Sequence, residues 1–365
     1  MEELDGMMFD IFKGKRILVT GHTGFKGSWL VLWLSQLGAE VHGYSLPPNT
    51  EPNHYTAVRI RELLKSECLA DIRDREQLRN YVHEVQPDCI FHLAAQPLVR
   101  RSYAEPVETF DANVMGSIYL MEAVRTLGKP CTMIMITSDK CYRNDHHVWG
   151  YRECDPLGGH DPYSASKAAA EIVVASYRDS FFSPEKIAEH GVHLASVRAG
   201  NVIGGGDWAE DRIIPDAVRA VTSGRSLEVR SPQAVRPWQH VLEPLSGYML
   251  LASKMLGGEE GLEGAWNFGP LPTGAATVRE ITEEFYRVWG KGEAVYDPAL
   301  ANLHEAELLR LSSEKAMTYL GWRPMWDLSK TLLKTAEWYR RYYSGEDARV
   351  LSLVDIKRYM AQMEG

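Results

Sequence analysis

The chain has 365 residues, of which 45% are hydrophobic and 24% are charged. This composition is too apolar for a disordered protein, and the length predicts one large domain with an added lobe, or two domains. The formal net charge of -9 argues against binding along nucleic acid, which depends on a basic surface, whereas a small anionic substrate needs only a few arginines.

The N-terminal residues and the cysteines predict a cytoplasmic protein. The first ten residues, MEELDGMMFD, are acidic where a signal peptide is basic, and no apolar run reaches the roughly 18 residues that a membrane span needs. The five cysteines show neither a CxxC pair nor a zinc-like spacing, and His146 and His147 lack a third ligand at a suitable spacing. We therefore expect free thiols, no metal and no contact with a membrane.

In the first half of the chain, short apolar runs alternate with longer helical patterns. The expected elements are strand 16–20, helix 25–37, strand 41–44, strand 88–93, helix 107–127, strand 131–137, helix 165–180 and strand 192–198. Several of these runs are apolar at every position, as in strands that helices cover on both sides. The alternation predicts an α/β fold, a Rossmann-type doubly wound parallel sheet.

After residue 201 the sequence changes in character, with three consecutive glycines, several prolines and tryptophans, and shorter elements. We expect residues 1–200 to form a dinucleotide-binding domain, to which roughly residues 238–265 return. Residues 201–237 and 266–365 are then expected to form a smaller, mixed α/β substrate-binding lobe. Trp322, Trp326 and Trp338 are expected in the core or at an interface rather than stacked on a base.

Three glycines at intervals of three, Gly21, Gly24 and Gly27, lie between the first strand and the first helix. In this setting Gly21 allows a tight turn, Gly24 lets the backbone approach a pyrophosphate, and Gly27 permits close packing of the helix. The helix N-terminus adds unpaired N–H donors for phosphates. A dinucleotide site is therefore predicted, and the residues expected to contact it here are Gly21, His22, Gly24, Phe25, Lys26 and Gly27.

The end of the second strand bears on the choice of dinucleotide. Tyr44 and Ser45 occupy the position where many NAD proteins have an Asp or Glu for the adenosine ribose. No arginine follows Ser45 directly to bind the 2′-phosphate of NADP, which leaves Lys26, Arg59 and Arg61 as alternative partners. We predict NAD as the cofactor.

Tyr163 and Lys167 lie four residues apart in a helical stretch rich in alanine and serine, so both side chains are expected on one face. The preceding strand ends in the polar sequence Thr137-Ser138-Asp139-Lys140, at the sheet edge where ligands bind. An ammonium next to a phenol favours the phenolate, which predicts that Lys167 lowers the pKa of Tyr163 and makes it a base.

Longer stretches of the sequence carry a family resemblance. They are GHTGFKGSWL at 21–30, DIRD at 71–74, FHLAAQPLVRRSY at 91–103, TSDKCY at 137–142, YSASK at 163–167, RAGNVIGGGDWAEDRIIPD at 198–216, RPWQHVLEPLSGY at 236–248 and AWNFGP at 265–270. Together they resemble the CDP-glucose 4,6-dehydratases, which are extended short-chain dehydrogenases/reductases of the NAD-dependent epimerase/dehydratase family. The resemblance runs from about Lys13 to Trp338. The sequence departs from the family near Leu311-Ser312-Ser313, where an Asp commonly follows the Leu.

The resemblance implies a set of cofactor and substrate contacts. Asp71 and Ile72 would lie at the adenine edge of NAD, and Leu93, Ala94 and Ala95 would line the cofactor cleft together with the Tyr-Lys pair. For the substrate, the implied contacts are Gln96 with the sugar, Asn201 with the nicotinamide and substrate diphosphate, and Arg212 and Arg236 with the nucleotide phosphates.

The resemblance also implies a reaction, the conversion of CDP-D-glucose into CDP-4-keto-6-deoxy-D-glucose in the biosynthesis of deoxysugars such as those of lipopolysaccharide. It proceeds by oxidation at C4, elimination of water across C5 and C6, and hydride return to C6. Tyr163 would take the 4-hydroxyl proton, Ser138 would bind the forming carbonyl, and a protonated Asp139 would release the 6-hydroxyl. Lys140, desolvated and partly neutral, would either remove the C5 proton or orient Asp139.

Other functions stay open at this point. Tyr163, Lys167 and the glycine turn would also serve a 4-epimerase or a dehydratase of another nucleotide sugar, although an epimerase needs no acid such as Asp139. A non-catalytic NAD-sensing regulator fits the Tyr-Lys pair less well. The helices 107–127 and 165–180 carry more apolar surface than one sheet face can cover, which predicts a homodimer or homotetramer built on a four-helix contact.

Overall fold

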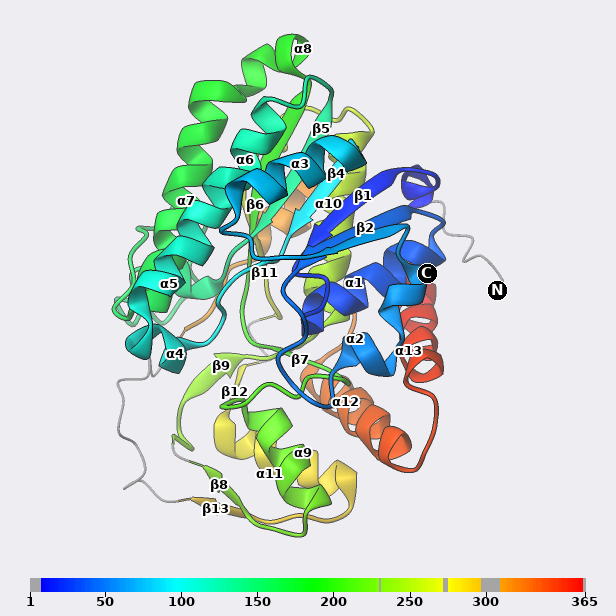
Figure 1. Cartoon of the computed structure of the whole chain (residues 1–365). Coiled ribbons are helices and arrows are strands. Elements are labelled where there is room, and N and C mark those ends of the chain that lie inside the picture. The colour runs from blue at the N-terminus through cyan, green and yellow to red at the C-terminus, as the bar shows by residue number, and fades with distance from the viewer. Residues whose placement is uncertain (1–7, 230, 272–274, 297–308, 364–365) are drawn as a thin grey trace.

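A seven-stranded parallel sheet organises the upper part of the molecule in Figure 1. The computed structural model describes residues 8–229, 231–271, 275–296 and 309–363, so most of the acidic N-terminal segment lies outside the described residues. The strand order is β11-β6-β5-β4-β1-β2-β3, and every neighbouring pair is parallel. The strands are β1 (Arg16–Thr20), β2 (Glu40–Ser45), β3 (Ser66–Leu69), β4 (Cys89–His92), β5 (Cys131–Ile136), β6 (Val192–Ala199) and β11 (Gly264–Phe268).

Alternate residues of the central strands point into two cores, one on each face of the sheet. In β1, Ile17 and Val19 belong to the core that contains Trp29, whereas Leu18 belongs to the core that contains Leu120. Because both faces are covered, these strands are apolar throughout. The predicted Rossmann-type doubly wound fold is confirmed. The main covering helices are α1 (Phe25–Gln36) and α10 (Leu242–Leu256) on one face, and α3 (Arg75–Val85), α6 (Gly116–Arg125) and α7 (Pro162–Phe181) on the other.

The structure adds β11, α3 and α10 to the predicted elements, and it differs from them in two further places. The edge strand β3 is not predicted by the sequence pattern, because Ser66 and Glu67 are polar and the strand is only four residues long. The helix expected over 107–127 is built from α5 (Pro106–Phe110), a π-helical turn (Asp111–Met115) and α6. A hydrophobic period shows that a helix exists but does not show such an internal turn.

Smaller elements form the lower part of the molecule (Figure 1). Three two-stranded sheets pair β7 (Val202–Ile203) with β10 (Gln239–His240), β8 (Leu227–Val229) with β13 (Ala294–Tyr296), and β9 (Val235–Pro237) with β12 (Ala275–Thr277). The remaining helices are α2 (His54–Ala57), α4 (Val99–Ala104), α8 (Ile187–His190), α9 (Ile213–Thr222), α11 (Val278–Trp289), α12 (Leu328–Tyr343) and α13 (Ala348–Met363).

The C-terminal part packs against both halves of the chain. Helix α12 contacts α11, and α13 returns to contact α1 and α2. Trp322, Trp326 and Trp338 are all buried in the core, as predicted. The division into two domains stays a prediction. Among the described helices, none combines the length and apolar character needed to cross a membrane.

Candidate active site

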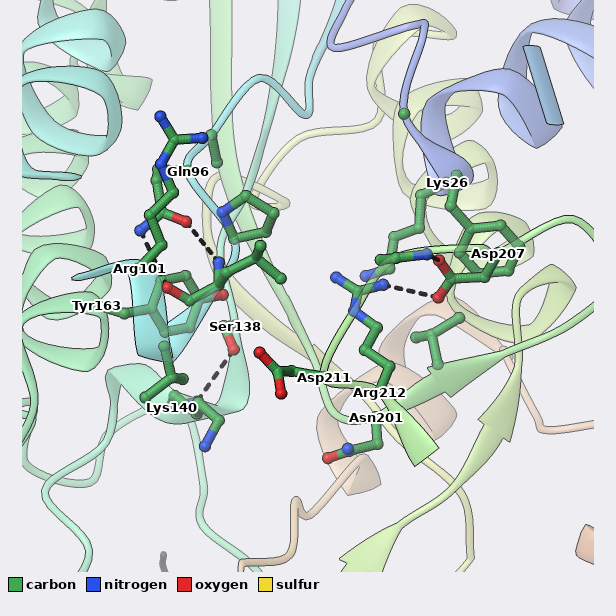
Figure 2. Close-up of a pocket in the computed structure, with 18 of the residues that line it drawn as sticks. Lys26, Gln96, Arg101, Ser138, Lys140, Tyr163, Asn201, Asp207, Asp211 and Arg212 are labelled. Carbon is green, nitrogen blue, oxygen red and sulfur yellow. Dashed lines mark hydrogen bonds and ion pairs between the residues drawn. The ribbon is translucent and has the colours of Figure 1, made fainter. Parts of the chain in front are cut away.

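A large cleft lies between the carboxyl ends of the sheet strands and the smaller elements below them (Figure 2). Its volume is about 1370 Å³, above the range of roughly 300–1,000 Å³ that is typical of a pocket for one small ligand. It therefore has room for a dinucleotide and a nucleotide sugar together. The predicted site residues that line it are Gly21, Gly24, Phe25, Lys26, Gly27, Asp71, Ile72, Leu93, Ala94, Ala95, Gln96, Ser138, Asp139, Lys140, Tyr163, Lys167, Asn201, Arg212 and Arg236.

The glycine turn between β1 and α1 has the geometry that a pyrophosphate needs. Gly21 has a φ of +75°, and a Cβ atom there would lie 2.7 Å from the backbone nitrogen of Ala94. A Cβ atom at Gly27 would overlap the carbonyl oxygen of Gly21. Gly24 precedes α1 without a side-chain cap, which leaves first-turn N–H groups for an anionic ligand. The residues of this turn fit a dinucleotide.

The charged residues near the adenosine end favour NAD over NADP. Arg59 is paired with Asp347 at 2.9 Å, and Arg61 is paired with Glu67 at 3.0 Å. Neither arginine lines the cleft. Two of the three alternative partners for a 2′-phosphate are therefore held by carboxylates outside the cleft, and only Lys26 of the three lines it. Strand β2 ends in the buried, neutral Ser45.

The position of His22 corrects one prediction. Its side chain is fully buried behind the glycine turn and does not line the cleft. The Nε2 atom lies 2.7 Å from Oε1 of Glu67 on β3, and a Cβ atom on Gly43 would lie 2.7 Å from the His22 ring. Burial lowers the pKa of His22, and this effect outweighs the contact with Glu67, which raises it. The His22 side chain thus anchors the turn to the sheet from outside the cleft.

Lys26 extends from the same turn into the centre of the cleft. Its Nζ atom donates a hydrogen bond to the hydroxyl of Tyr248 at 3.5 Å. Burial, together with the nearby charges of Arg212 and Lys167, lowers its pKa to about 7, although the carboxylate of Asp139 raises it. The lysine of the cofactor turn therefore lies close to the predicted catalytic and phosphate-binding groups.

The predicted redox pair is placed by the start of α7. Asp161 caps this helix by accepting a hydrogen bond from the backbone N–H of Ser164 at 2.9 Å. Tyr163 and Lys167 are both buried, and Nζ of Lys167 donates to the carbonyl of Ile136 at the end of β5, at 3.4 Å. The helix cap and the sheet edge thus fix both side chains at the cleft wall.

The protonation of this pair differs from the prediction. Burial raises the pKa of Tyr163 to about 12, and the groups that lower it are the hydroxyl of Ser138 and the charge of Arg212, not Lys167. Burial also lowers the pKa of Lys167 to about 8, although Glu171 raises it. The loss of solvation outweighs the neighbouring charge because both groups are enclosed by protein.

Ser138, Asp139 and Lys140 form a tight turn directly after β5. The Ser138 hydroxyl donates to Oδ1 of Asp139 at 3.0 Å and accepts from the backbone N–H of Lys140 at 3.2 Å. Oδ2 of Asp139 is buried and has no hydrogen-bond partner among the described residues. Burial raises the pKa of Asp139, although Lys140 and Ser138 lower it. Asp139 is therefore suited to hold a proton.

Lys140 does not have the environment that was expected for it. Its side chain is partly exposed, whereas the prediction was a desolvated, partly neutral amine. Its charge instead acts on Asp139 by lowering the pKa of that carboxyl.

Cationic side chains gather on the opposite wall. Arg212, just before α9, is paired with Asp207 at 2.8 Å (Figure 2). Arg236 on β9 is buried and donates to the carbonyl of Val235 at 3.0 Å, while its charge lowers the pKa of Asp139. Asn201, which follows β6, lines the same region. Two guanidinium groups thus face the catalytic turn, as the binding of a diphosphate requires.

Gln96 lines the cleft, but its amide is engaged within its own loop. The Nε2 atom donates to the carbonyl of Leu98 at 3.0 Å and to the hydroxyl of Thr109 at 2.9 Å. Its Oε1 atom accepts from the backbone N–H of Leu98 at 2.6 Å. The side chain shapes the loop after β4, and its contact with the sugar stays a prediction.

Two contributors to the site were not predicted. Asp207 holds Arg212, and Tyr248 holds Lys26 from a position 222 residues away in sequence. Asp207 comes directly after the three glycines and shortly before Arg212. This closeness in sequence is only a weak signal that the two side chains pair. Tyr248 has no local signal, because only folding of α10 against the sheet brings it next to Lys26.

Comparisons with known proteins agree with this geometry. The family model described as GDP-mannose 4,6 dehydratase matches residues 18–335. The CDP-glucose 4,6-dehydratase of Salmonella typhimurium is 48% identical over 352 residues, which cover 96% of this chain and 98% of that protein. The dTDP-glucose 4,6-dehydratase of Streptomyces antibioticus is 27% identical, across 74% of this chain and 75% of that protein.

Solved structures share the architecture. The crystal structure of UDP-glucose 4-epimerase from Thermus thermophilus, in complex with NAD, matches with a TM-score of 0.75 and 27% identity, over 89% of this chain and 99% of that chain. On the strength of the family model and the relative with 48% identity, the chain belongs to the GDP-mannose 4,6-dehydratase family.

Proposed function

We propose that the protein converts CDP-D-glucose into CDP-4-keto-6-deoxy-D-glucose, with NAD bound in the cleft. The observation that carries the proposal is the buried carboxyl of Asp139 in the same cleft as Tyr163, because release of the 6-hydroxyl needs a group that holds a proton. The relative with 48% identity is a CDP-glucose 4,6-dehydratase, which supports the choice of nucleotide.

The oxidation at C4 begins the proposed reaction. When bound, NAD would be held by the glycine turn that carries Gly21, Gly24 and Gly27, and it would supply the redox chemistry, a hydride borrowed from C4 and returned to C6 without net consumption. Tyr163 takes the proton of the 4-hydroxyl, while Ser138 donates a hydrogen bond to the forming carbonyl oxygen. Lys167, one helical turn away, supplies a positive charge that stabilises the phenolate as it forms.

The elimination follows because the 4-ketone acidifies the hydrogen on C5. Asp139 gives its proton to the 6-hydroxyl, which leaves as water. Lys140 adjoins Asp139 and is the candidate base for the C5 proton. Alternatively, Lys140 orients Asp139 and adjusts the pKa of its carboxyl. This role is supported by the charge of Lys140, which lowers that pKa.

The proposed substrate binds across the cleft. Arg212 and Arg236 pair with the two phosphates, and Asn201 donates a hydrogen bond to the diphosphate. The sugar then lies between this wall and the Ser138–Tyr163 wall (Figure 2). The rival reading, a 4-epimerase, is disfavoured because an epimerase has no use for a protonated Asp139.

Product formation from four nucleotide sugars tests the proposal. Purified protein is incubated separately with CDP-, dTDP-, GDP- and UDP-glucose, and the ultraviolet chromophore of a 4-keto product is measured in alkali. We expect turnover of CDP-glucose above the others, NAD bound after purification, and no accumulation of free NADH. Stoichiometric NADH, or a 4-epimer in place of the keto sugar, would contradict the proposed reaction.

We also propose a homo-oligomer in the cytoplasm. Exposed apolar residues lie on the outer side of α5 and α7, which neighbour each other in Figure 1; they are Val107, Phe110 and Ile172. Such a surface suits the same helices of a second copy in a four-helix contact. All five cysteines are free thiols, in keeping with a reducing compartment.

A further inference from the structure

The catalytic face of α7 continues for one more turn beyond Lys167. Tyr163, Lys167 and Glu171 recur every four residues, so they lie in a row on one side of the helix. Glu171 is buried, with a relative exposure of 3%. Its carboxylate accepts hydrogen bonds from the hydroxyl of Thr137 and from the hydroxyl of Ser196 at 2.7 Å. Thr137 immediately precedes the catalytic turn, so Glu171 holds one end of that turn.

The other end of the turn is held through Arg198. This guanidinium, also 3% exposed, donates from Nη2 to Glu171 at 2.8 Å and from Nη1 to the hydroxyl of Tyr142 at 2.6 Å. It also lies over the Tyr142 ring, 4.8 Å from its centre. Tyr142 immediately follows the turn, and its hydroxyl donates to Asn267 of β11 at 2.8 Å. One buried ion pair thus contacts both ends of the segment Thr137–Tyr142.

A buried ion pair is weak evidence for stability, because apolar residues of similar volume fill such space as well or better. Connected buried hydrogen bonds do, however, fix the geometry of the groups that they join. The groups joined here are the helix that carries Tyr163 and Lys167 and the turn that carries Ser138 and Asp139. Catalytic groups must be held within roughly 0.5 Å of their working positions by surrounding contacts.

We infer that Glu171 and Arg198, acting through Thr137 and Tyr142, are positioning residues that hold Ser138 and Asp139 in register with Tyr163. The inference rests on the proposed function, since it assigns these residues to the same reaction. A separate observation agrees with it: Glu171 raises the pKa of Lys167 against the effect of burial, so the pair also bears on the charge of the redox lysine.

The test uses Tyr142→Phe, which keeps the ring next to Arg198 but removes the hydroxyl that links Arg198 to Asn267. Glu171→Gln is less suitable, because it leaves a guanidinium buried without its carboxylate and destabilises the whole fold. The matched control is Tyr359→Phe. Tyr359 is also fully buried, and its hydroxyl donates to the buried carboxylate of Glu243 at 2.6 Å, away from the cleft.

Steady-state kinetics gives the first measurement. Because misplacement by about 1 Å costs on the order of a hundredfold in rate, we expect Tyr142→Phe to lower kcat by about tenfold to a hundredfold. KM for CDP-glucose should stay within about twofold, since the phosphate-binding arginines lie on the other wall. Tyr359→Phe should leave kcat unchanged. Equal losses in both variants, or an unchanged kcat in Tyr142→Phe, would overturn the inference.

Hydrogen exchange gives a second measurement that does not depend on activity. In Tyr142→Phe, amides of a peptide covering residues 137–142 should exchange about tenfold faster or more, while a peptide covering 324–328 stays unchanged. Tyr359→Phe should give the opposite pattern, because Glu243 accepts from the backbone N–H of Trp326. If the wild type turns over no nucleotide sugar, the proposed function fails, yet this exchange pattern still decides the positioning role. Unchanged exchange at 137–142 would reject it.

Discussion

Asp139 and Asp71 both line the cleft, but their surroundings give the same side chain opposite properties. Asp71 accepts hydrogen bonds from Arg73, which lower the pKa of its carboxyl. Asp139 has one buried oxygen without a partner among the described residues, and burial raises its pKa. The first carboxylate is therefore suited to accept hydrogen bonds, and the second is suited to donate a proton.

Replacement of Asp139 should separate oxidation from elimination. In Asp139→Asn we expect the first hydride transfer to proceed, because Tyr163 and Ser138 remain, while elimination slows by roughly 10²- to 10⁴-fold without its acid. In a single turnover, the absorbance of reduced nicotinamide should rise and persist in the variant but be transient or invisible in the wild type.

A second variant serves as the control for this experiment. Tyr163→Phe should bind both ligands yet show no reduced nicotinamide, because it lacks the base for the 4-hydroxyl. If Asp139→Asn behaves in the same way as Tyr163→Phe, then Asp139 acts in the oxidation or in positioning, and the proposed division of roles is wrong.

At the level of single elements, the glycines of the turn from β1 to α1 differ in the space that is available for a side chain. A Cβ atom at Gly27 would overlap the carbonyl oxygen of Gly21, whereas at Gly24 the nearest atom would lie 3.3 Å away. We expect Gly27→Ala to lower the free energy of unfolding by about 1–3 kcal/mol, as overpacking does. Gly24→Ala should keep most of the stability but weaken NAD binding, because Gly24 lines the cleft in the turn that would hold the pyrophosphate.

Thermal unfolding and calorimetric titration with NAD would check this pair of variants. The prediction requires a lower melting temperature for Gly27→Ala than for Gly24→Ala. Equal melting temperatures would mean that the turn relaxes around the added methyl group, so that close packing is not the reason for glycine at position 27.

Helix α13 carries a buried carboxyl that should make stability depend on pH. Burial raises the pKa of Asp355 from 3.8 to about 7, although Lys334 and Arg358 lower it. The folded state therefore keeps this proton where the unfolded chain has lost it. The stabilisation from Asp355 is full below the unfolded pKa and is lost as the pH rises through the folded pKa.

Asp355→Asn removes this titration. Relative to the wild type, the variant should gain about 2–3 kcal/mol in free energy of unfolding between about pH 5 and about pH 8, since each pKa unit corresponds to about 1.4 kcal/mol. Denaturant unfolding of both proteins at the two pH values measures the difference. A constant difference would show that Asp355 is ionised in the folded protein throughout this range.

For the whole molecule, the proposed oligomer depends on the outer side of α5 and α7. Ile172 on α7 is 59% exposed, and Val350 on α13 is 54% exposed, on a different side of the molecule. We expect a homodimer or homotetramer by light scattering at micromolar concentration. Ile172→Glu should shift the protein toward the monomer, because it places a charge in the apolar contact, whereas Val350→Glu should not. A monomeric wild type would refute the four-helix contact.

The sequence alone determined the features that are local. The apolar runs and the glycine spacing were sufficient for the five inner strands of the sheet, the β1–α1 turn and the dinucleotide site, because strand burial and tight turns restrict residue type directly. The position of Tyr163 and Lys167 on one helix face follows from their spacing in the same way. The roles of Arg212 and Arg236 came from the family resemblance, and the structure adds that both face the catalytic turn.

The tertiary structure decided the features that depend on burial and on distant partners. The sequence could not show that His22 points away from the cleft to Glu67, or that Glu171 and Arg198 join α7 to the catalytic turn. It predicted a lowered pKa for Tyr163, but the pKa is raised because enclosure by protein outweighs the hydrogen bond with Ser138 and the charge of Arg212. Desolvation and long-range contacts exist only once the chain has folded, so residue types and spacing cannot reveal them.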